Sequence, residues 1–372
     1  MKKPTIEDVA QRAGVSKSTV SQFLNKRYKY MSDQTRDRIA EVIQELNYQP
    51  NGLARSLKQN RTFMVGVIVA NVDYTLSIQS IRAIEEELQH FGIQVIICNA
   101  DENPDKESQY IEMLKARQVD GLIIFPTGKH ADIYNQLIRE KYPLVFLDRL
   151  VDGVNTRSLL LDNEMAIKLA IQELVSHKHE RIALITLPLG VNRITPRVER
   201  LSGYKKALEE AGLPFREEYM HSVPREEIQQ TLKELFQLPE PPTALLAGND
   251  IVLAEVLKYV NARRMRIPAE LSIIGIDDAE FAHIYNPPIT TITQPIGDMG
   301  KQAAKTLLSS IEEGGESVPI IYRFVPDINR GNPSKCCRRA ASHTCKNSPY
   351  SFVRLSMHML FRHTKANAGY LQ

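Results

Sequence analysis

The hydrophobic pattern near the start of the chain has the spacing of two short helices joined by a tight turn. Apolar residues fall at i, i+3, i+4 and i+7 along the first: Ile6, Val9, Ala10 and Ala13. Thr5 and Asp8 match a capping box at its beginning, and Gly14 stands where a left-handed residue can end it. Ser16 suits the N-cap of the second helix. Its expected buried side comprises Val20, Phe23 and Leu24. The pattern predicts a helix-turn-helix.

The opposite face of the second helix is polar: Lys17, Ser18, Ser21 and Gln22. Lysine reaches guanine or a phosphate, glutamine bonds adenine at two points, and serine contacts either bases or phosphates, so this face suits a DNA major groove. The loop Lys26–Met31, in which Lys29 lies between two tyrosines, suits phosphate contacts. A solvated helix face and a solvated loop are the alternatives.

A third helix is predicted from Ser32, because Ile39, Val42, Ile43 and Leu46 repeat the same apolar spacing. These elements form a unit of fewer than fifty residues, which should gain stability from a larger body and from dimerisation. Residues 51–58 follow Pro50 and are too few to hold a helix alone in water. DNA could order them by admitting Ala54 and Leu57 to the minor groove. A plain linker explains them equally well.

From Met64 onward the chain alternates apolar strand-like runs with amphipathic segments of helical length. A strand from Met64, a helix over 75–91, a strand over 93–98 and a helix over 106–117 come first. Further apolar runs occur at 121–125, 144–147, 182–186, 244–247 and 273–276. Runs that are apolar throughout are typical of parallel strands buried on both faces. About 260 residues of this kind predict two doubly wound α/β lobes with a ligand site at the strand ends.

Polar residues follow several of these predicted strands. They are Asn71, Asp148 with Arg149, Asn249 with Asp250, and Asp277 with Asp278. Each alone is explained as a helix cap. Together they offer the carboxylates, amides and guanidinium that a hydroxyl-rich ligand requires.

Charge is distributed unevenly, although the whole chain carries only +3. Residues 1–61 carry +6 and residues 329–372 carry +8, which leaves −11 for the middle. A basic head on an acidic body indicates a polyanionic partner for the head. The cysteines form no disulfide framework, the N-terminus has no apolar leader region, and no apolar run reaches eighteen residues, so we expect a cytoplasmic protein. Familiar catalytic and phosphate-loop motifs are missing, which argues against an enzyme.

The order of these motifs resembles the lactose repressor family of bacterial transcription regulators over roughly residues 4–325. The resemblance is carried by T-I-E-D-V-A, A-G-V-S and S-T-V-S at the head, L-N-Y-Q-P-N-G-L-A-R-S-L at the hinge, and V-F-L-D-R, R-L-S-G-Y, G-N-D, G-I-D-D and P-P-I-T-T-I-T-Q-P in the body. The loop Lys26–Met31 is about one residue longer than in the lactose repressor itself. Gly52 lowers helix propensity in the hinge by up to ~1 kcal/mol.

The resemblance implies roles for particular residues. The expected DNA contacts are Thr5, Lys17, Ser18, Thr19, Ser21, Gln22, Asn25, Lys29, Asn51, Ala54, Arg55 and Leu57, with Leu57 as the minor-groove lever. The expected effector contacts are Asn71, Asp148, Arg149, Arg200, Asn249, Asp277 and Gln294. Two arginines favour an acidic sugar such as a 2-keto-3-deoxy sugar acid, unless Arg149 pairs with a neighbouring carboxylate.

The resulting prediction is a homodimeric repressor of a carbohydrate operon, with a tetramer left open. Its partners would be double-stranded operator DNA and a small sugar or sugar acid, without cofactor, metal or membrane. The expected domains are a head over 1–49, a hinge over 50–61, lobe 1 over 62–161 and 291–322, and lobe 2 over 162–290 and 323–328. Residues 329–372 contain no acidic residue and are expected to be a disordered extension. A basic arm, or a metal site at Cys336, Cys337, His343 and Cys345, is the alternative.

A soluble sugar-binding transport protein and an α/β enzyme are the rival classes. The transport protein would share the two lobes but lacks a basic helical head. The enzyme would need a catalytic group beside Asp277 and Asp278, the only adjacent acidic pair at the predicted strand ends.

Overall fold

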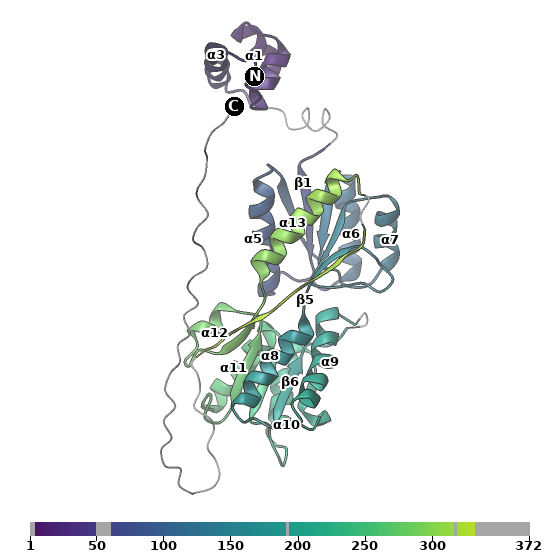
Figure 1. Cartoon of the computed structure of the whole chain (residues 1–372), viewed down its shortest axis with the longest axis vertical. Coiled ribbons are helices and arrows are strands. Elements are labelled where there is room, and N and C mark those ends of the chain that lie inside the picture. Colours follow the sequence, from purple (N-terminus) through teal and green to yellow (C-terminus); the bar gives the residue numbers. More distant parts are fainter. Residues whose placement is uncertain (1–3, 50–60, 191–192, 316–317, 332–372) are drawn as a thin grey trace, which may run out of the picture. The chain divides into compact units, whose positions relative to one another are not determined.

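The computed structural model describes residues 4–49, 61–190, 193–315 and 318–331 (Figure 1). The head consists of helices α1 (Ile6–Ala13), α2 (Lys17–Leu24) and α3 (Asp33–Glu45). Thr5 and Asp8 form the predicted capping box, Gly14 ends α1 at φ 64°, and Ser16 and Ser32 cap α2 and α3 through their side chains. The buried core of the head comprises Val9, Ala10, Ala13, Val20, Ile39, Val42 and Tyr48. The predicted helix-turn-helix is therefore confirmed.

Lobe 1 is built on a parallel sheet with helices on both faces. Its strands lie in the order β11-β5-β4-β3-β1-β2. The strands are β1 (Met64–Val69), β2 (Gln94–Asn99), β3 (Gly121–Ile124), β4 (Leu144–Leu147), β5 (Arg157–Leu161) and β11 (Ile321–Phe324). The helices are α5 (Thr75–Gln89), α6 (Pro104–Ala116), α7 (Ala131–Arg139) and α13 (Ile296–Glu312). Gly300 lets α13 approach α5 closely, because an added Cβ would lie 2.7 Å from the Ala83 Cβ.

Lobe 2 repeats the same sheet plan, in the order β12-β10-β9-β8-β6-β7. Its strands are β6 (Ile182–Thr186), β7 (Met220–Ser222), β8 (Ala244–Ala247), β9 (Ser272–Ile276), β10 (Thr290–Thr293) and the antiparallel β12 (Asp327–Asn329). Its helices are α8 (Asn163–Ser176), α9 (Thr195–Glu210), α10 (Ile228–Leu235), α11 (Asp250–Arg263) and α12 (Glu280–Ile284), with short 3-10 turns at Glu217–Tyr219 and Arg225–Glu227. β1, β3 and β4 of lobe 1 thus correspond in position to β6, β8 and β9.

The central strands are buried on both faces, as their uninterrupted apolar sequences predict. Each residue of β3, β4, β6 and β8 is buried. In each lobe, one apolar cluster lies on each face of the sheet. This burial fixes the strands and therefore the positions of the polar residues that follow them.

The predicted lobe boundaries need small corrections. β10 pairs with β9, so residues 291–293 belong to lobe 2 rather than to lobe 1. β11 pairs with β5 through Phe324, so residues 323 and 324 belong to lobe 1. Both strands lie where the chain crosses between the lobes, so the hydrophobic pattern alone does not show to which lobe each belongs.

The described part of lobe 2 extends beyond residue 328. Asn329 pairs with Thr291, Arg330 forms an ion pair with Glu173 at 2.8 Å, and the Gly331 N–H donates to the Thr290 hydroxyl at 3.2 Å. Residues 329–331, which the prediction assigned to the extension, are therefore part of lobe 2. The cysteines of the predicted extension and His343 lie outside the described residues.

Candidate functional site

The outer face of α2 is exposed in the described head. Lys17, Ser18 and Gln22 are exposed, while Ser21 is half-buried. Lys17 forms an ion pair with Glu7 at 2.7 Å, but both side chains are more than half exposed, so the pair stabilises little and is easily exchanged for a phosphate. This face of α2 is therefore accessible to a partner with a groove wide enough for a helix.

Other predicted DNA-contacting residues shape the head as well. Thr5 caps α1, and the Thr19 hydroxyl lies 2.8 Å from that of Ser16. The Asn25 amide donates to the Ser21 carbonyl at 2.7 Å and so helps to end α2. Lys29 is exposed in the loop, with its Nζ 5.7 Å from the centre of the Tyr30 ring. Asn51, Ala54, Arg55 and Leu57 lie outside the described residues, as does the whole predicted hinge helix.

A cavity lies between the two lobes at the carboxyl ends of their strands. Among the predicted effector contacts, it is lined by Asp148, Arg149, Arg200, Asn249, Asp277 and Gln294. Its volume is about 50 Å³. Small-molecule sites typically enclose roughly 300–1,000 Å³. The cavity in this structure is therefore smaller than a typical small-molecule site.

Asp148 and Asp277 occupy equivalent positions in the two lobes. Asp148 follows β4 with φ 70°, and Asp277 follows β9 with φ 76°. A left-handed backbone is uncommon outside glycine and tends to persist at functional sites. Burial raises the pKa of Asp148, and it raises the pKa of Asp277 to about 6 against the opposing effect of Arg200. Each lobe thus presents one buried carboxylate to the cavity.

Arg200 is held on α9 by two hydrogen bonds within lobe 2. Its Nε donates to the Asn163 side chain at 2.9 Å, and its Nη1 donates to the Gly248 carbonyl at 2.6 Å. The Asn249 side chain caps α11 by accepting from the Val252 N–H at 3.0 Å. The cap explanation is therefore correct for Asn249, and the residue lines the cavity as well.

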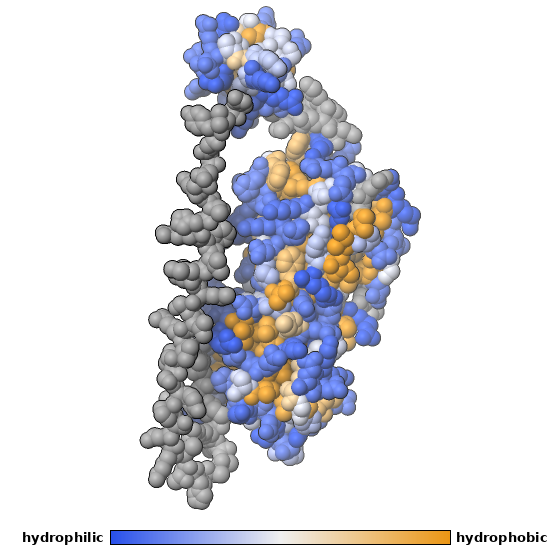
Figure 2. Space-filling model, in the orientation of Figure 1, coloured by the Kyte–Doolittle hydropathy of each residue, from blue (hydrophilic) through white to orange (hydrophobic). Residues whose placement is uncertain are grey.

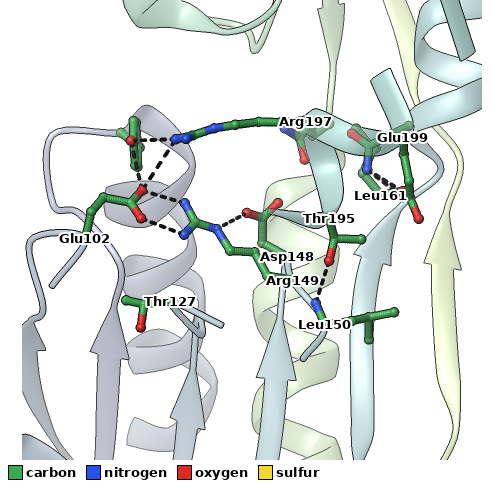
Figure 3. A network of polar contacts seen from close by, with 12 residues as sticks. Glu102, Thr127, Asp148, Arg149, Leu150, Leu161, Thr195, Arg197 and Glu199 are labelled. Carbon is green, nitrogen blue, oxygen red and sulfur yellow. Dashed lines mark hydrogen bonds and ion pairs between the residues drawn. The ribbon is translucent and has the colours of Figure 1, made fainter. Parts of the chain in front are cut away.

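Arg149 pairs with a neighbouring carboxylate, as the alternative explanation proposed. Its Nη1 and Nη2 donate to the two oxygens of Glu102 at 2.9 and 2.8 Å, and its Nε lies 3.5 Å from an oxygen of Asp148. Figure 3 shows the Arg149 guanidinium between these two carboxylates. Burial alone would raise the pKa of Glu102, but the bonds from Arg149 lower it to about 2. The ground for preferring an acidic sugar is weakened, because Arg149 is already neutralised.

Polar contacts cross from one lobe to the other around the cavity. The Asp250 carboxylate accepts from the Thr75 N–H at 3.0 Å. It thus caps α5, for which Tyr74 supplies no side-chain cap. The Leu150 N–H donates to Thr195 at 2.9 Å, as Figure 3 shows. These bonds must break or rearrange when the lobes move.

Three buried side-chain atoms at the cavity have no hydrogen-bond partner among the described residues: the donor Arg149 Nε and the oxygens Thr186 Oγ1 and Gln294 Oε1. The Gln294 amide nitrogen already donates to Asp277. Unsatisfied buried polar atoms cost free energy, and ligand hydroxyls can satisfy the Thr186 and Gln294 oxygens. The arrangement is suited to binding a hydroxyl-rich molecule.

The cavity differs from the prediction in several residues. Asn71 is not among its lining residues, and its side chain accepts from the Asp73 N–H at 2.8 Å within a turn. Sequence reasoning missed further lining residues: Tyr74, Leu76, Thr186, Leu187, Ile194, Pro196, Arg197 and Gly248. Thr186 could have been found because it ends a predicted strand, and Arg197 because it precedes Arg200 by one helical turn.

The head and the cavity together define a class of proteins in which a helix-turn-helix is joined to a two-lobed binding body. A family model described as "Bacterial regulatory proteins, lacI family" matches residues 5–51, and one described as "Periplasmic binding protein-like domain" matches residues 171–329.

Individual proteins and structures agree with these two models. The chain is 46% identical over 328 residues to a probable HTH-type transcriptional regulator EndR of Paenibacillus polymyxa, covering 87% of this chain and 96% of that protein. It is 31% identical over 318 residues to the HTH-type transcriptional regulator KdgR of Bacillus subtilis, covering 85% and 93%. A crystal structure of the Lac repressor dimer bound to operator and the anti-inducer ONPF is similar with a TM-score of 0.76 and 26% identity, covering 89% of this chain and 99% of that one. The chain belongs to the lacI family and is a helix-turn-helix transcriptional regulator.

None of the described helices combines the length and apolar character needed to cross a membrane.

Proposed function

We propose that the protein represses a carbohydrate operon, and that a small sugar or sugar acid bound between the lobes controls its affinity for the operator. The observation that carries this proposal is the cavity between the strand ends, in which buried carboxylates from both lobes face unsatisfied polar atoms. A ligand that contacts both lobes binds their alternative arrangements with different affinity and thereby shifts the equilibrium. The proposed action is binding rather than catalysis, in the cytoplasm.

In the proposed DNA complex, each recognition helix α2 lies in the major groove of one half-site. Exposure of Lys17 and Gln22 in the folded head supports this assignment. If Gln22 reads a base, Gln22→Ala should cost ~1–3 kcal/mol and relax preference at one position, whereas Lys29→Ala should weaken binding to all sequences alike. Gln44→Ala is the matched control, because Gln44 is exposed on α3 outside the helix-turn-helix.

The experiment is selection of operator sequences from a random DNA library, followed by gel-shift titration of the variants. A pseudopalindromic consensus is expected, because a two-fold dimer presents two identical helices. A uniform loss across all sequences with Gln22→Ala would remove this residue from base readout.

We further propose that the working form is a homodimer in which α5 and β2 take part. Ile78 on α5 is 56% exposed, Ile97 on β2 is 50% exposed, and Phe91 between these elements is 55% exposed. Apolar atoms gather in several patches over both lobes in Figure 2, and exposed apolar patches commonly mark interfaces. Ile78→Glu should shift sedimentation toward the monomer. Val325→Glu, at a residue 67% exposed, is the control and should leave the dimer intact.

The effector site is tested by calorimetry on Arg200→Ala. Shifting the lobes from mostly one state to mostly the other requires roughly 5 kcal/mol of differential binding, more than a single hydrogen bond supplies. Loss of one central guanidinium should therefore reduce the affinity for the sugar. It should also reduce the change in operator affinity that the sugar causes. Arg216→Ala provides the control on the surface of the same lobe, where its side chain pairs with Glu240. Sugar affinity that survives Arg200→Ala unchanged would exclude Arg200 from the site.

A further inference from the structure

We propose that Glu102 sets the charge class of the effector, so that the cavity selects an uncharged polyhydroxy ligand over its carboxylate counterpart. Glu102 acts through Arg149, whose guanidinium it occupies, and is therefore a positioning residue rather than a direct ligand contact. The inference rests on the effector site proposed above. It goes further by naming which kind of sugar that site accepts.

The contacts of Glu102 leave Arg149 little capacity to receive an anion. Both oxygens of Glu102 accept from Arg149 at 2.8 and 2.9 Å in a two-point arrangement. Such a paired arrangement is among the stronger protein ion pairs and has a fixed geometry. Arg149 is only 5% exposed, and its remaining nitrogen faces Asp148. A ligand carboxylate would have to displace Glu102 to bind this guanidinium.

Arg197 is likewise engaged by protein groups. Its Nη1 donates to the Pro188 carbonyl at 2.5 Å, and its Nη2 donates to the Tyr74 hydroxyl at 3.2 Å. The same Nη2 lies 3.6 Å from Glu102, which also accepts from the Tyr74 hydroxyl at 3.0 Å. Figure 3 shows that Arg149 and Arg197 both contact the Glu102 carboxylate. Glu102, from lobe 1, therefore pairs with one arginine from each lobe.

Carboxylates outnumber guanidinium groups around the cavity. Three arginines line it, namely Arg149, Arg197 and Arg200. Four carboxylates face or adjoin them: Asp148 and Asp277 in the lining, and Glu102 and Asp250 just outside it. A further carboxylate would be repelled, whereas ligand hydroxyls could donate to the aspartates.

Gln294 Oε1, one of the unsatisfied atoms at the cavity, favours a ligand that donates a hydrogen bond. Gln294 Oε1 is buried and accepts no hydrogen bond among the described residues. A hydroxyl can donate to it, but an ionised carboxylate cannot. The Thr186 hydroxyl can pair with either group. Gln294 Oε1 therefore requires a hydroxyl rather than a carboxylate as its partner, and Asp148, 3.5 Å from the unbonded Arg149 Nε, opposes the approach of an anion to that nitrogen.

The test replaces Glu102 by Gln, which keeps the shape of the side chain but removes its charge. Affinities are measured by calorimetry at pH 7.5 for matched probes: glucose with glucuronate, galactose with galacturonate, cellobiose, and 2-keto-3-deoxygluconate. We expect the natural protein to prefer the neutral probes. Glu102→Gln should raise the affinity ratio of acidic to neutral probe by roughly tenfold, the size of one charge-assisted hydrogen bond. The double variant with Arg149→Gln should lose that gain.

Glu313→Gln is the matched control, because Glu313 also pairs with a lobe 1 arginine, Arg157, but does not line the cavity. Its affinity ratio should equal that of the natural protein. Tighter binding of acidic than neutral probes by the natural protein would overturn the inference, as would an unchanged ratio in Glu102→Gln, and either result would leave the effector site intact. Failure of every probe to bind both proteins would instead refute the proposed effector function.

Discussion

A buried carboxyl group in lobe 1 should make the stability of the protein fall as the pH rises. Glu107 on α6 is only 2% exposed. Its oxygens accept from the Tyr134 hydroxyl and from the Thr127 N–H, the latter at 2.8 Å. Thr127 follows β3 and lies near Glu102 in Figure 3. Glu107 thus anchors a loop beside the ion pairs of the cavity.

The magnitude follows from the pKa of this group. Burial raises the pKa of Glu107 from 4.5 to about 7, against the lowering effect of the Thr127 bond. Each pKa unit corresponds to about 1.4 kcal/mol, so the total linkage is about 3 kcal/mol. Because the folded state holds the proton more tightly, this stability is fully present below pH 4.5 and is lost as the pH rises through 7. Deprotonation then leaves a buried charge.

Glu107→Gln should remove this pH dependence. The glutamine amide can donate to Tyr134 and its oxygen can accept from Thr127, so both contacts retain a partner. Urea unfolding followed by circular dichroism at pH 5, 6, 7 and 8 measures the effect. The natural protein should lose about 2.5 kcal/mol more than the variant between pH 5 and 8, because part of the total linkage is already lost at pH 5. Asp277, with its pKa of about 6, contributes a loss of the same sign to both proteins and cancels in the comparison.

The control is Glu112→Gln, because Glu112 is exposed on the same helix. This variant should retain the pH dependence of the natural protein. Identical pH profiles for Glu107→Gln and the natural protein would refute the reasoning. They would show that ionisation of Glu107 does not change the free energy of unfolding.

Three further changes have defined outcomes. Asp250→Ala removes the carboxylate that caps α5 from lobe 2 and should lower stability by about 1 kcal/mol. It should also enlarge the ligand-free radius of gyration in X-ray scattering, and an unchanged radius would show that this bond does not hold the lobes together. Asp8→Ala breaks the capping box of α1 and should lower operator affinity on warming while sugar affinity, measured by calorimetry, stays constant. Truncation after Gly331 should preserve the melting temperature. Truncation after Asn329 should lower the melting temperature, because it removes the Arg330–Glu173 pair. Equal melting temperatures for the two truncations would show that Arg330 and Gly331 do not stabilise lobe 2.

Local signals were sufficient to predict the head and the central strands. The capping box at Thr5, the left-handed Gly14 and the caps at Ser16 and Ser32 all act over three or four residues, so the sequence contains the whole interaction. Strands β4, β6 and β8 have the predicted bounds, because an uninterrupted apolar run can be satisfied only inside a sheet covered on both faces.

Most of the missed strands lack such a run or lie at an edge, and β5 (Arg157–Leu161), an interior strand with three leucines, is the exception. β7 (Met220–Ser222) is an edge strand of three residues, two of them polar, and β10 consists mostly of threonine. Their pairing depends on neighbours distant in the sequence. Short polar strands of this kind gave no recognisable local signal.

The cavity could be predicted only in part for the same reason. Asp148 and Asp277 were recognisable as strand ends in a doubly wound fold. Glu102 stands in an ordinary acidic turn, and its role depends on Arg149 and Arg197, 47 and 95 positions further along the chain. Only the folded structure brings these three charges together.

The central claim is that a ligand between the lobes controls recognition of a specific DNA sequence by the head. The most direct measurement is a titration of the selected operator with the natural protein and with Arg200→Ala, each with and without the sugar that binds most tightly. We predict sequence-specific binding by both proteins, with an operator affinity that the sugar changes by at least about tenfold in the natural protein only, since allosteric coupling is typically 1–3 kcal/mol. Equal operator affinity with and without bound sugar in the natural protein would contradict the account.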